Sequence, residues 1–337
     1  MNPRTRLTLD LIRSFPRAEH KMTRAATLAA YAVGRMAGIP TLARWQSRHP
    51  LHAYLLLTTR CNMSCDDCYF FDVINKKTVG KLDFDLDQIK ANYGQSLFRS
   101  VSRVVLIGGE PTLNKEFVDI IRFFRRKGIV VSVTSNVLRL NRPLLEQMRD
   151  AGLNMLNLSI YRHTERGQKY NLDVIKLVLK EAHTGAFDPH RIVLSFHATD
   201  AATYRWAYEF AVDAGAQGLL FNRQFYTSSN PADGEYAEQA GFGAEFEALC
   251  RQIQAEKKLE LYFAATADID PNSCPFTTNA FSMGPNNTLS PCCMVTPDAA
   301  FGRLEEPAPL LAFKDMFLAG QVPTACASCH MLGTKHF

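Results

Sequence analysis

The pattern of hydrophobic and polar positions divides the chain into three regions, of which the middle one is the most regular. Between residues 52 and 225, short apolar runs alternate with longer stretches whose apolar positions recur every three or four residues. Runs of the first kind are typical of buried strands, and stretches of the second kind are typical of amphipathic helices. Strands are predicted over residues 54–59, 104–107, 130–134, 155–160, 192–197 and 218–222, and helices over 85–98, 114–127, 141–151, 171–183 and 201–214.

Each predicted helix is followed by a strand after a short break. Gly128, Gly152 and Gly215 stand in three of these breaks, at the position where glycine commonly ends a helix. Repeated strand–helix units imply a parallel sheet whose crossovers are helices. Ligands of such α/β folds bind at the carboxyl ends of the strands, so we look for the chemistry there.

The flanking regions have a different character. Residues 1–50 have apolar positions at helical spacing, and Pro16 and Pro40 divide the segment into pieces. Residues 226–337 show weaker periodicity, more Pro, Asn and Gly, and most of the nine cysteines. The predicted domains are therefore a helical extension (1–50), an α/β core (51–225) and a smaller appended domain (226–337).

Charge is concentrated in the first region. Residues 1–50 contain nine Lys or Arg against Asp10 and Glu19, a net charge of +7, whereas the whole chain carries +5. The simpler interpretation is that these helices pack against the core and present their charged side chains to solvent. The alternative is an amphipathic helix in peripheral contact with anionic lipid. Aromatic residues are not interleaved with these charges, which argues against a nucleic-acid partner.

The composition is that of a globular protein, with 47% hydrophobic and 21% charged residues. The start of the chain lacks the apolar run of a signal peptide. The most apolar early stretch, residues 25–43, is interrupted by Arg35 and Pro40 and is too polar to span a bilayer. We therefore expect a cytoplasmic protein, in which clustered cysteines are metal ligands rather than disulfides.

Three cysteines follow the first predicted strand. Cys61, Cys65 and Cys68 lie within eight residues and can hold one face of an iron–sulfur cube. A 4Fe–4S cluster with three protein thiolates leaves one iron open, which is the requirement for chelating S-adenosylmethionine (SAM). The alternative is zinc, which prefers four ligands and cysteine pairs separated by two residues; the three-residue gap between Cys61 and Cys65 argues against it.

This spacing after a strand resembles the signature of the radical SAM superfamily. Gly108-Gly109-Glu110 after the second strand resembles the family's Gly-Gly-Glu motif. The resemblance implies a partial (β/α)6 TIM-type barrel that cleaves SAM reductively to a 5′-deoxyadenosyl radical. The SAM-binding residues that it implies are Gly108, Gly109, Glu110, Ser135, Asn136 and Ser159.

One position departs from the family pattern. The family usually has an aromatic residue before the third cysteine, where this chain has Asp67, and the aromatics Tyr69 and Phe70 follow instead. The contact with adenine is therefore expected to differ in detail, while the cluster is unaffected.

A second set of cysteines resembles the SPASM/Twitch extension of the same family. The resemblance implies one auxiliary 4Fe–4S cluster held by Cys274, Cys292, Cys326 and Cys329. Asn287 stands where the family usually has a turn glycine, and asparagine tolerates the left-handed turn conformation. Two alternatives stay open: Cys293 could replace Cys292, and the four cysteines could hold zinc. Cys250 is expected to be a buried thiol on a helix.

Substrate residues are expected at the strand ends. The catalytic candidates are Tyr161, His197 and Arg223, within a wider set that includes His163, Asn222, Gln224 and Tyr226. Arg223 suits an anionic group. The alternative for each of these residues is a satisfied polar side chain without contact to substrate.

The predicted activity is hydrogen abstraction from, or radical addition to, an organic substrate in natural-product or specialised-metabolite biosynthesis. The partners would be a small-molecule or peptide substrate and a flavodoxin- or ferredoxin-type electron donor. Peptide-modifying and lipid-modifying enzymes of the family are the rivals, and a molybdopterin precursor cyclase is disfavoured by its third-cysteine spacing. The hypothesis outside enzymes is a metal-binding interaction module, which would not consume SAM.

Overall fold

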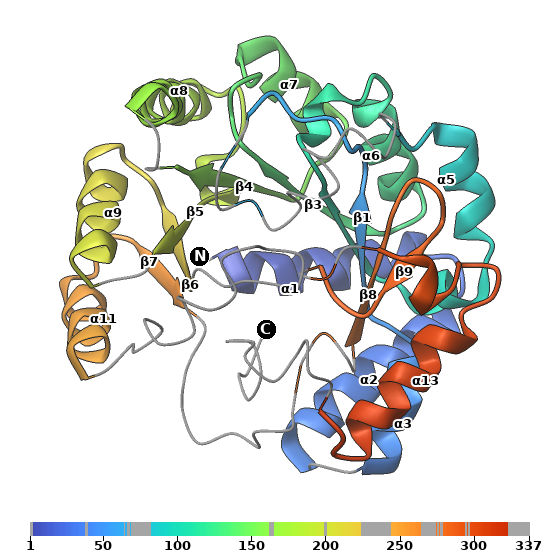
Figure 1. The fold of residues 1–337 in the computed structure, drawn as a ribbon. Helices are drawn as coiled ribbons and strands as arrows, with labels where there is room; N and C mark the ends of the chain where they lie inside the picture. Colours follow the sequence, from blue (N-terminus) through green and yellow to red (C-terminus); the bar gives the residue numbers. More distant parts are fainter. Residues whose placement is uncertain are drawn as a thin grey trace.

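A curved, largely parallel β-sheet forms the centre of the computed structural model (Figure 1). The structure describes residues 3–37, 40–63, 65, 68, 82–161, 165–198, 201–223, 244–263, 274, 276, 279–293, 295 and 297–322. The strands are β1 (His52–Leu56), β2 (Arg103–Ile107), β3 (Val130–Ser135), β4 (Met155–Ile160), β5 (Ile192–Ala198), β6 (Gly218–Arg223), β7 (Glu260–Phe263), β8 (Ala280–Met283) and β9 (Leu289–Ser290).

The order of strands across the sheet is β7-β6-β5-β4-β3-β2-β1-β8-β9. All neighbouring strands pair in parallel except β8 and β9, which form an antiparallel hairpin. From β1 to β7, consecutive strands along the chain are therefore neighbours in the sheet, as expected when each crossover is short and of the same hand. The arrangement is the partial barrel that the sequence predicted.

Helices cover the outer side of this sheet (Figure 1). They are α5 (Leu86–Tyr93), α6 (Phe117–Arg126), α7 (Arg142–Asp150), α8 (Glu165–His183), α9 (Ala201–Asp213) and α11 (Ala244–Glu256). Single 3-10 turns lie at Phe15–Arg17, Ser96–Ser100, Pro111–Leu113, Pro189–Arg191 and Ala299–Phe301. Two helices begin with side-chain caps, because Asp85 and Asn141 accept hydrogen bonds from the backbone N–H groups of Gln88 and Leu144.

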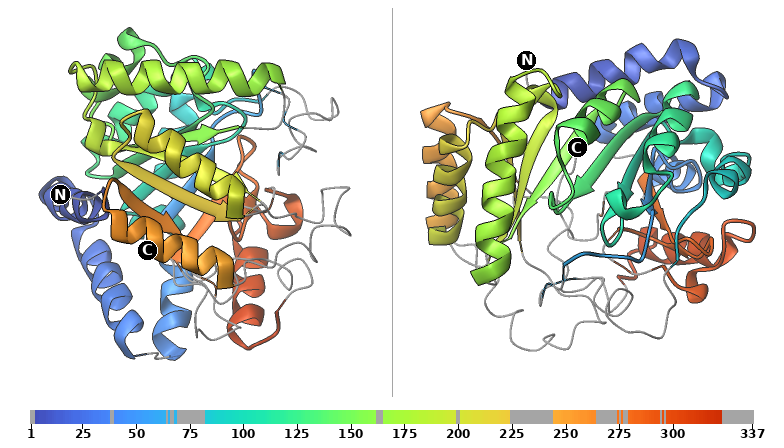
Figure 2. Two further views of the ribbon diagram at one scale, coloured as in Figure 1. Left: turned by 90° about the vertical axis from the view of Figure 1, so that its left-hand side faces the viewer. Right: turned by 90° about the horizontal axis from the view of Figure 1, so that it is seen from above.

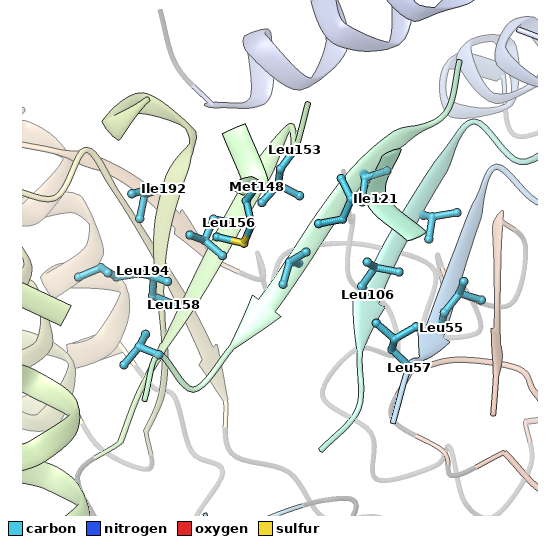
Figure 3. Close-up of a cluster of buried hydrophobic side chains, with 14 of the residues drawn as sticks. Leu55, Leu57, Leu106, Ile121, Met148, Leu153, Leu156, Leu158, Ile192 and Leu194 are labelled. Atoms are coloured by element: carbon cyan, nitrogen blue, oxygen red, sulfur yellow. The ribbon is translucent and has the colours of Figure 1, made fainter. Parts of the chain in front are cut away.

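The main core lies between the sheet and these helices. Alternate strand residues point outward, and Leu55, Leu106, Leu156 and Leu194 pack there with helix residues such as Ile121 (Figure 3). Their side chains are almost fully removed from solvent. Because strand side chains alternate, the residues between them face the interior of the barrel.

The interior of the barrel is more polar than the outer core. Ser132, Thr134, Asn157, Ser159 and Ser195 alternate with the outward-facing residues of β3, β4 and β5 and are buried or half-buried. Small polar side chains at these positions leave hydrogen-bonding groups inside the barrel, where the large aliphatic residues of a filled core would otherwise stand.

The N-terminal segment is helical, as predicted. It forms α1 (Pro3–Ser14), α2 (Lys21–Ala37) and α3 (Pro40–Arg48). Figure 2 shows α1 at the end of the barrel opposite the strand arrowheads. There, Asp10 forms an ion pair with Arg191 and accepts a 2.9 Å hydrogen bond from Asn154, two residues that precede β5 and β4. The segment thus packs against the amino ends of the strands.

Beyond residue 225 the chain returns to the sheet on both sides. Strand β7 joins β6, and β8 joins β1, while α13 (Ala308–Leu318) packs beside α3. The sequence analysis identified neither β7 nor β8, because four-residue strands with mixed polarity give a weak periodic signal. The division into three domains stays a prediction, since the hairpin it assigned to an appended domain extends the central sheet. No helix in the described part of the chain has the length and apolar character needed to cross a lipid bilayer.

Candidate active site

The loop that carries the first three cysteines begins at the carboxyl end of β1 and is tied to the next segment of the chain. The backbone N–H of Thr59 donates to the carbonyl of Leu82 at 2.9 Å. Arg60 forms an ion pair with Asp83 and donates to the Leu113 carbonyl at 2.7 Å. These contacts fix the direction in which the cysteine loop leaves the sheet.

The three cysteines are half-buried in this loop. The backbone N–H of Cys68 donates to the Cys65 carbonyl at 3.3 Å, and the Cys61 thiol accepts from the Met63 N–H at 3.4 Å. Burial raises the pKa of the Cys61 thiol. Three cysteine thiols within one short loop are a donor set that suits a metal-containing group, because both iron–sulfur clusters and zinc bind cysteine thiolates.

Gly108 and Gly109 allow β2 to end directly beside the start of the cysteine loop. A Cβ on Gly108 would lie 2.5 Å from the Thr58 carbonyl oxygen, and one on Gly109 would lie 2.1 Å from that of Arg60. The sequence analysis assigned these glycines to close approach of SAM. In the structure both positions must be glycine for another reason, because any side chain would collide with the backbone of Thr58 or Arg60 at the start of the cysteine loop.

Glu110 is the most enclosed charged group at this end of the barrel. Its side chain is fully buried. One oxygen accepts from the N–H and hydroxyl of Thr112 at 3.2 and 2.7 Å and from the Ser135 hydroxyl at 2.9 Å, and the other accepts from the Asn136 N–H at 2.7 Å. Burial raises the pKa of Glu110, and these hydrogen bonds oppose the rise. The carboxylate thereby joins the end of β2 to the end of β3.

Asn136 completes the connection to the cysteine loop. Its side-chain amide donates to the Asn62 side-chain oxygen at 2.8 Å and lies 3.7 Å from the Cys61 sulfur. The structure therefore brings together five predicted residues, namely Cys61, Gly109, Glu110, Ser135 and Asn136, from three separate parts of the sequence.

Asn171 links the ends of β3 and β4 and was not found by sequence analysis. Its fully buried side chain donates to the carbonyls of Asn136 at 2.8 Å and Ser159 at 3.3 Å, and accepts from the Tyr161 N–H at 3.2 Å. Ser159 and Tyr161 are thus fixed at the same edge as Asn136. An asparagine on a helix gives no sequence signal for such a role.

The remaining catalytic candidates lie at the neighbouring strand ends. His197 is in β5 opposite Asn222, and Arg223 is in β6 opposite Ala198. The register places their backbones at the carboxyl edge, whereas their side chains lie outside the described part of the structure. Residues 163, 224 and 226 lie outside it altogether.

A second pair of cysteines flanks the β8–β9 hairpin. Cys274 precedes β8 and Cys292 follows β9, and both are half-buried. Asn287 in the turn has φ of 62°, which confirms the left-handed conformation predicted from the sequence. Cys326 and Cys329 lie outside the described residues.

The two other cysteines of this region have different surroundings. Cys293 is buried among Leu56, Val105 and Ile107 inside the barrel, in the cluster that also includes Cys68. Cys250 is buried in α11 within the main core, as the sequence suggested.

The sequence model of one protein family matches the part of the chain that builds this edge. It is described as the radical SAM superfamily and matches residues 55–201, which include the cysteine loop, the Gly-Gly-Glu turn and the ends of β3 and β4. Residues 55–201 of this chain belong to the radical SAM superfamily. Its cofactors are accordingly a 4Fe–4S cluster and SAM.

Individual relatives of this radical SAM protein are distant. Over 142 residues it is 30% identical to the protein named "Probable GTP 3′,8-cyclase" of Pyrococcus abyssi. The aligned stretch covers 40% of this chain and 44% of the relative. The match thus spans less than half of that relative's length.

Solved structures of similar fold cover more of the chain. Native anSMEcpe with bound AdoMet aligns with a TM-score of 0.59 and 14% identity over 84% of this chain and 88% of that one. Streptococcus suis SuiB bound to precursor peptide SuiA aligns with a TM-score of 0.57 and 13% identity over 85% of this chain and 71% of that one. At such low identity the likeness establishes the fold.

Two further residues of this radical SAM protein were missed by sequence analysis. Asn114 is buried and donates to the carbonyls of Leu57 and Phe84 at 3.2 and 2.7 Å, which holds the end of β1. Lys314 is buried on α13 and donates to the backbone carbonyls of Ser47 and Ala280. Asn114 could have been identified from the sequence, because it lies shortly after the Gly-Gly-Glu motif. Nothing in the sequence around Lys314 indicates a role for that residue.

Proposed function

We propose that this chain cleaves SAM reductively at a 4Fe–4S cluster held by Cys61, Cys65 and Cys68 and applies the resulting radical to an organic substrate inside the barrel. The observation that carries the proposal is the direct connection of the cysteine loop to the ends of β2 and β3 through Asn136 and Glu110. Bound there, the cluster supplies the one electron that breaks the C5′–S bond of SAM.

The protein residues then have positioning roles. Gly108 and Gly109 keep the floor beneath the cysteines free of side chains. The residues that the family resemblance assigns to SAM binding are Gly108, Gly109, Glu110, Ser135, Asn136 and Ser159, and we keep this role for all of them except Glu110. The carboxylate of Glu110 is already occupied by four donors, so we assign it the role of orienting Ser135 and Asn136, whose backbone and side chains face the site.

We further propose that Cys274, Cys292, Cys326 and Cys329 hold one auxiliary 4Fe–4S cluster of the SPASM/Twitch type. Support comes from the hairpin that carries Cys274 and Cys292 on either side of one turn. Four thiolates complete the ligand set of a cubane cluster.

The substrate that the barrel interior favours is a polar organic molecule. The small polar residues of β3, β4 and β5 offer hydrogen-bonding groups along the interior, and Tyr161, His197 and Arg223 are assigned to its carboxyl edge. The reaction is hydrogen abstraction from this substrate or addition to it. A flavodoxin- or ferredoxin-type protein is the proposed electron donor.

A peptide substrate is the second candidate. Two proteins of similar fold form complexes with peptides: Streptococcus suis SuiB with the precursor peptide SuiA, and anSMEcpe with the Cp18Cys peptide. The peptide hypothesis predicts that a peptide, but no small metabolite, accelerates SAM cleavage by this chain.

One variant tests both clusters. Replacement of Cys61, Cys65 and Cys68 by alanine should abolish the release of 5′-deoxyadenosine from SAM when dithionite is the reductant, because no ligands for the SAM-binding cluster remain. The same variant should retain about four irons per chain, the content of one cubane held by four thiolates. Product is measured by chromatography after anaerobic reconstitution, and iron and zinc are measured by elemental analysis.

The control is Cys250→Ala, which removes a buried thiol outside both ligand sets and should retain 5′-deoxyadenosine release and both clusters. Undiminished 5′-deoxyadenosine release by the triple variant would refute the first cluster. One zinc and no iron in that variant would refute the second.

A further inference from the structure

Lys314 is a buried lysine for which the proposed reaction has so far given no role. It lies on the inner side of α13 and its side chain is about 1% exposed. A buried ammonium loses its hydration and is destabilised unless hydrogen bonds and negative charge replace it. The groups around Lys314 therefore indicate which negative charge its ammonium interacts with.

Two of its hydrogen bonds go to backbone carbonyls. Its ammonium donates to Ala280 at 2.6 Å and to Ser47 at 3.3 Å. Ser47 is in the last turn of α3, where carbonyls lack helical partners and a cation is favoured. These bonds join α3, β8 and α13, but both acceptors are neutral.

The hairpin brings a cysteine to the end of β8 that carries one of these carbonyls. Ser282 pairs with Ser290 in the antiparallel β8–β9 ladder, and the ladder ends there. Cys292 follows two residues later, at the end of the hairpin away from its turn, where β8 begins with Ala280, the residue whose carbonyl binds Lys314. Cys274 reaches β8 from the other direction, six residues before Ala280.

The electrostatics agree with this placement. Burial lowers the pKa of Lys314 to about 7, and the charges of Cys274 and Cys292 oppose that drop. Both cysteines therefore interact electrostatically with Lys314.

We propose that Lys314 is a fixed buried cation that offsets the negative charge of the auxiliary cluster and raises its reduction potential. This inference rests on the proposed auxiliary cluster. Reduction by one electron adds one negative charge to the cluster and its four thiolates. A cation held nearby in a poorly hydrated site stabilises the reduced form more than the oxidised form.

The test uses the variant that lacks Cys61, Cys65 and Cys68, so that the auxiliary cluster is measured alone. Lys314→Gln and Lys314→Arg are added separately, and the midpoint potential is followed by electron paramagnetic resonance during reduction with dithionite. Glutamine keeps a donor for the carbonyls but removes the charge, whereas arginine keeps the charge.

For Lys314→Gln we expect the ratio of reduced to oxidised cluster at a given potential to fall about tenfold, which is about 59 mV for a one-electron couple. Lys314→Arg should stay within about threefold of the parent. Arg48→Gln is the matched control, since it removes one charge from the same α3–α13 contact at an exposed position, where its ion pair with Asp315 spans 2.7 Å. Solvent screening there should leave the potential close to the parent value.

The outcomes distinguish failure of the auxiliary-cluster proposal from failure of the role proposed for Lys314. If the parent triple variant holds no iron, the proposed auxiliary cluster is wrong, whatever Lys314 does. If the parent holds four irons and Lys314→Gln has an unchanged potential, the role of Lys314 is overturned and its function is to join the three elements. Loss of iron from both Lys314 variants would overturn it in the same way, because arginine preserves the charge.

Discussion

At the residue scale, Glu110 shows how the site combines an unfavourable burial with complete hydrogen bonding. Each of its two oxygens faces a backbone N–H, from Thr112 on one side and Asn136 on the other. Backbone donors cannot reverse their direction as hydroxyl groups can. Both oxygens must therefore remain acceptors, and this requirement explains why an acidic residue is tolerated in full burial.

Glu110→Gln tests this requirement. Whichever way the new amide is turned, its NH2 group faces one of the two backbone N–H donors and leaves it unsatisfied. We expect a loss of about 1–3 kcal/mol in the free energy of unfolding, although the substitution removes a buried charge. The measurement is urea denaturation of the reduced chain without clusters.

The control for this substitution is Glu181→Gln. Glu181 forms a 2.8 Å ion pair with Arg142 at the surface, where such pairs contribute little to stability. Its replacement should change the free energy of unfolding by less than about 1 kcal/mol. A Glu110→Gln protein as stable as the wild type would show that the backbone donors find other acceptors.

At the scale of elements, the regular part of the fold followed from the sequence. The six strands and five helices expected between residues 52 and 225 are present with shifts at their ends, because buried aliphatic runs and amphipathic periods are strong signals over such lengths. The first strand ends at Leu56, earlier than predicted, since the segment after it leaves the ladder with β2 to form the isolated bridge of Thr58 with Asp83.

The parts that the sequence did not predict depend on contacts between distant segments. Lys314 acquires its surroundings from α3 and β8, which are more than thirty residues away in the chain. Asn171 likewise acts on strand ends that precede it. Neither residue belongs to a motif, so only the folded arrangement shows what they bind.

The β8–β9 hairpin provides a prediction at this scale. Asn287 has the left-handed backbone of a turn glycine, and its side chain is also used. Its oxygen accepts from Gln88 at 3.0 Å and from the buried Asn92 at 2.7 Å, and its amide donates to Glu305 at 2.6 Å. The hairpin is thereby attached to α5.

Asn287→Gly should therefore destabilise the chain, although glycine is the usual family residue and suits the turn. Loss of the acceptor for Asn92 leaves a buried N–H unsatisfied, which costs about 1–3 kcal/mol. Urea denaturation gives the value. Lys257→Gly is the matched control, because Lys257 is exposed and has φ of 53°.

At Lys257 glycine relieves a left-handed conformation without removing a buried bond, so that variant should be as stable as the wild type or slightly more stable. Equal stability of Asn287→Gly and the wild type would mean that the side chain of Asn287 does not attach the hairpin.

At the scale of the whole molecule, the N-terminal helices act as part of the barrel. Arg24 is buried and donates to the hydroxyl of Tyr93 at 3.0 Å and to the carbonyl of Lys127 at 3.1 Å, at the end of α6. Arg6 forms an ion pair with Asp188. Part of the +7 charge of this segment is therefore engaged with the core and is not available to a surface.

This packing leads to a prediction about membranes. Arg13, Arg17 and Lys21 are exposed, together with the apolar side chains of Ile12 and Met22, which are 63% and 85% exposed. A basic residue near an anionic surface contributes about 1 kcal/mol, so a patch of this size binds vesicles weakly at most. We expect the full-length chain to remain in the supernatant after sedimentation with anionic vesicles at low salt. Co-sedimentation that high salt and Met22→Ser both weaken would instead establish peripheral membrane contact and favour a lipid-like substrate.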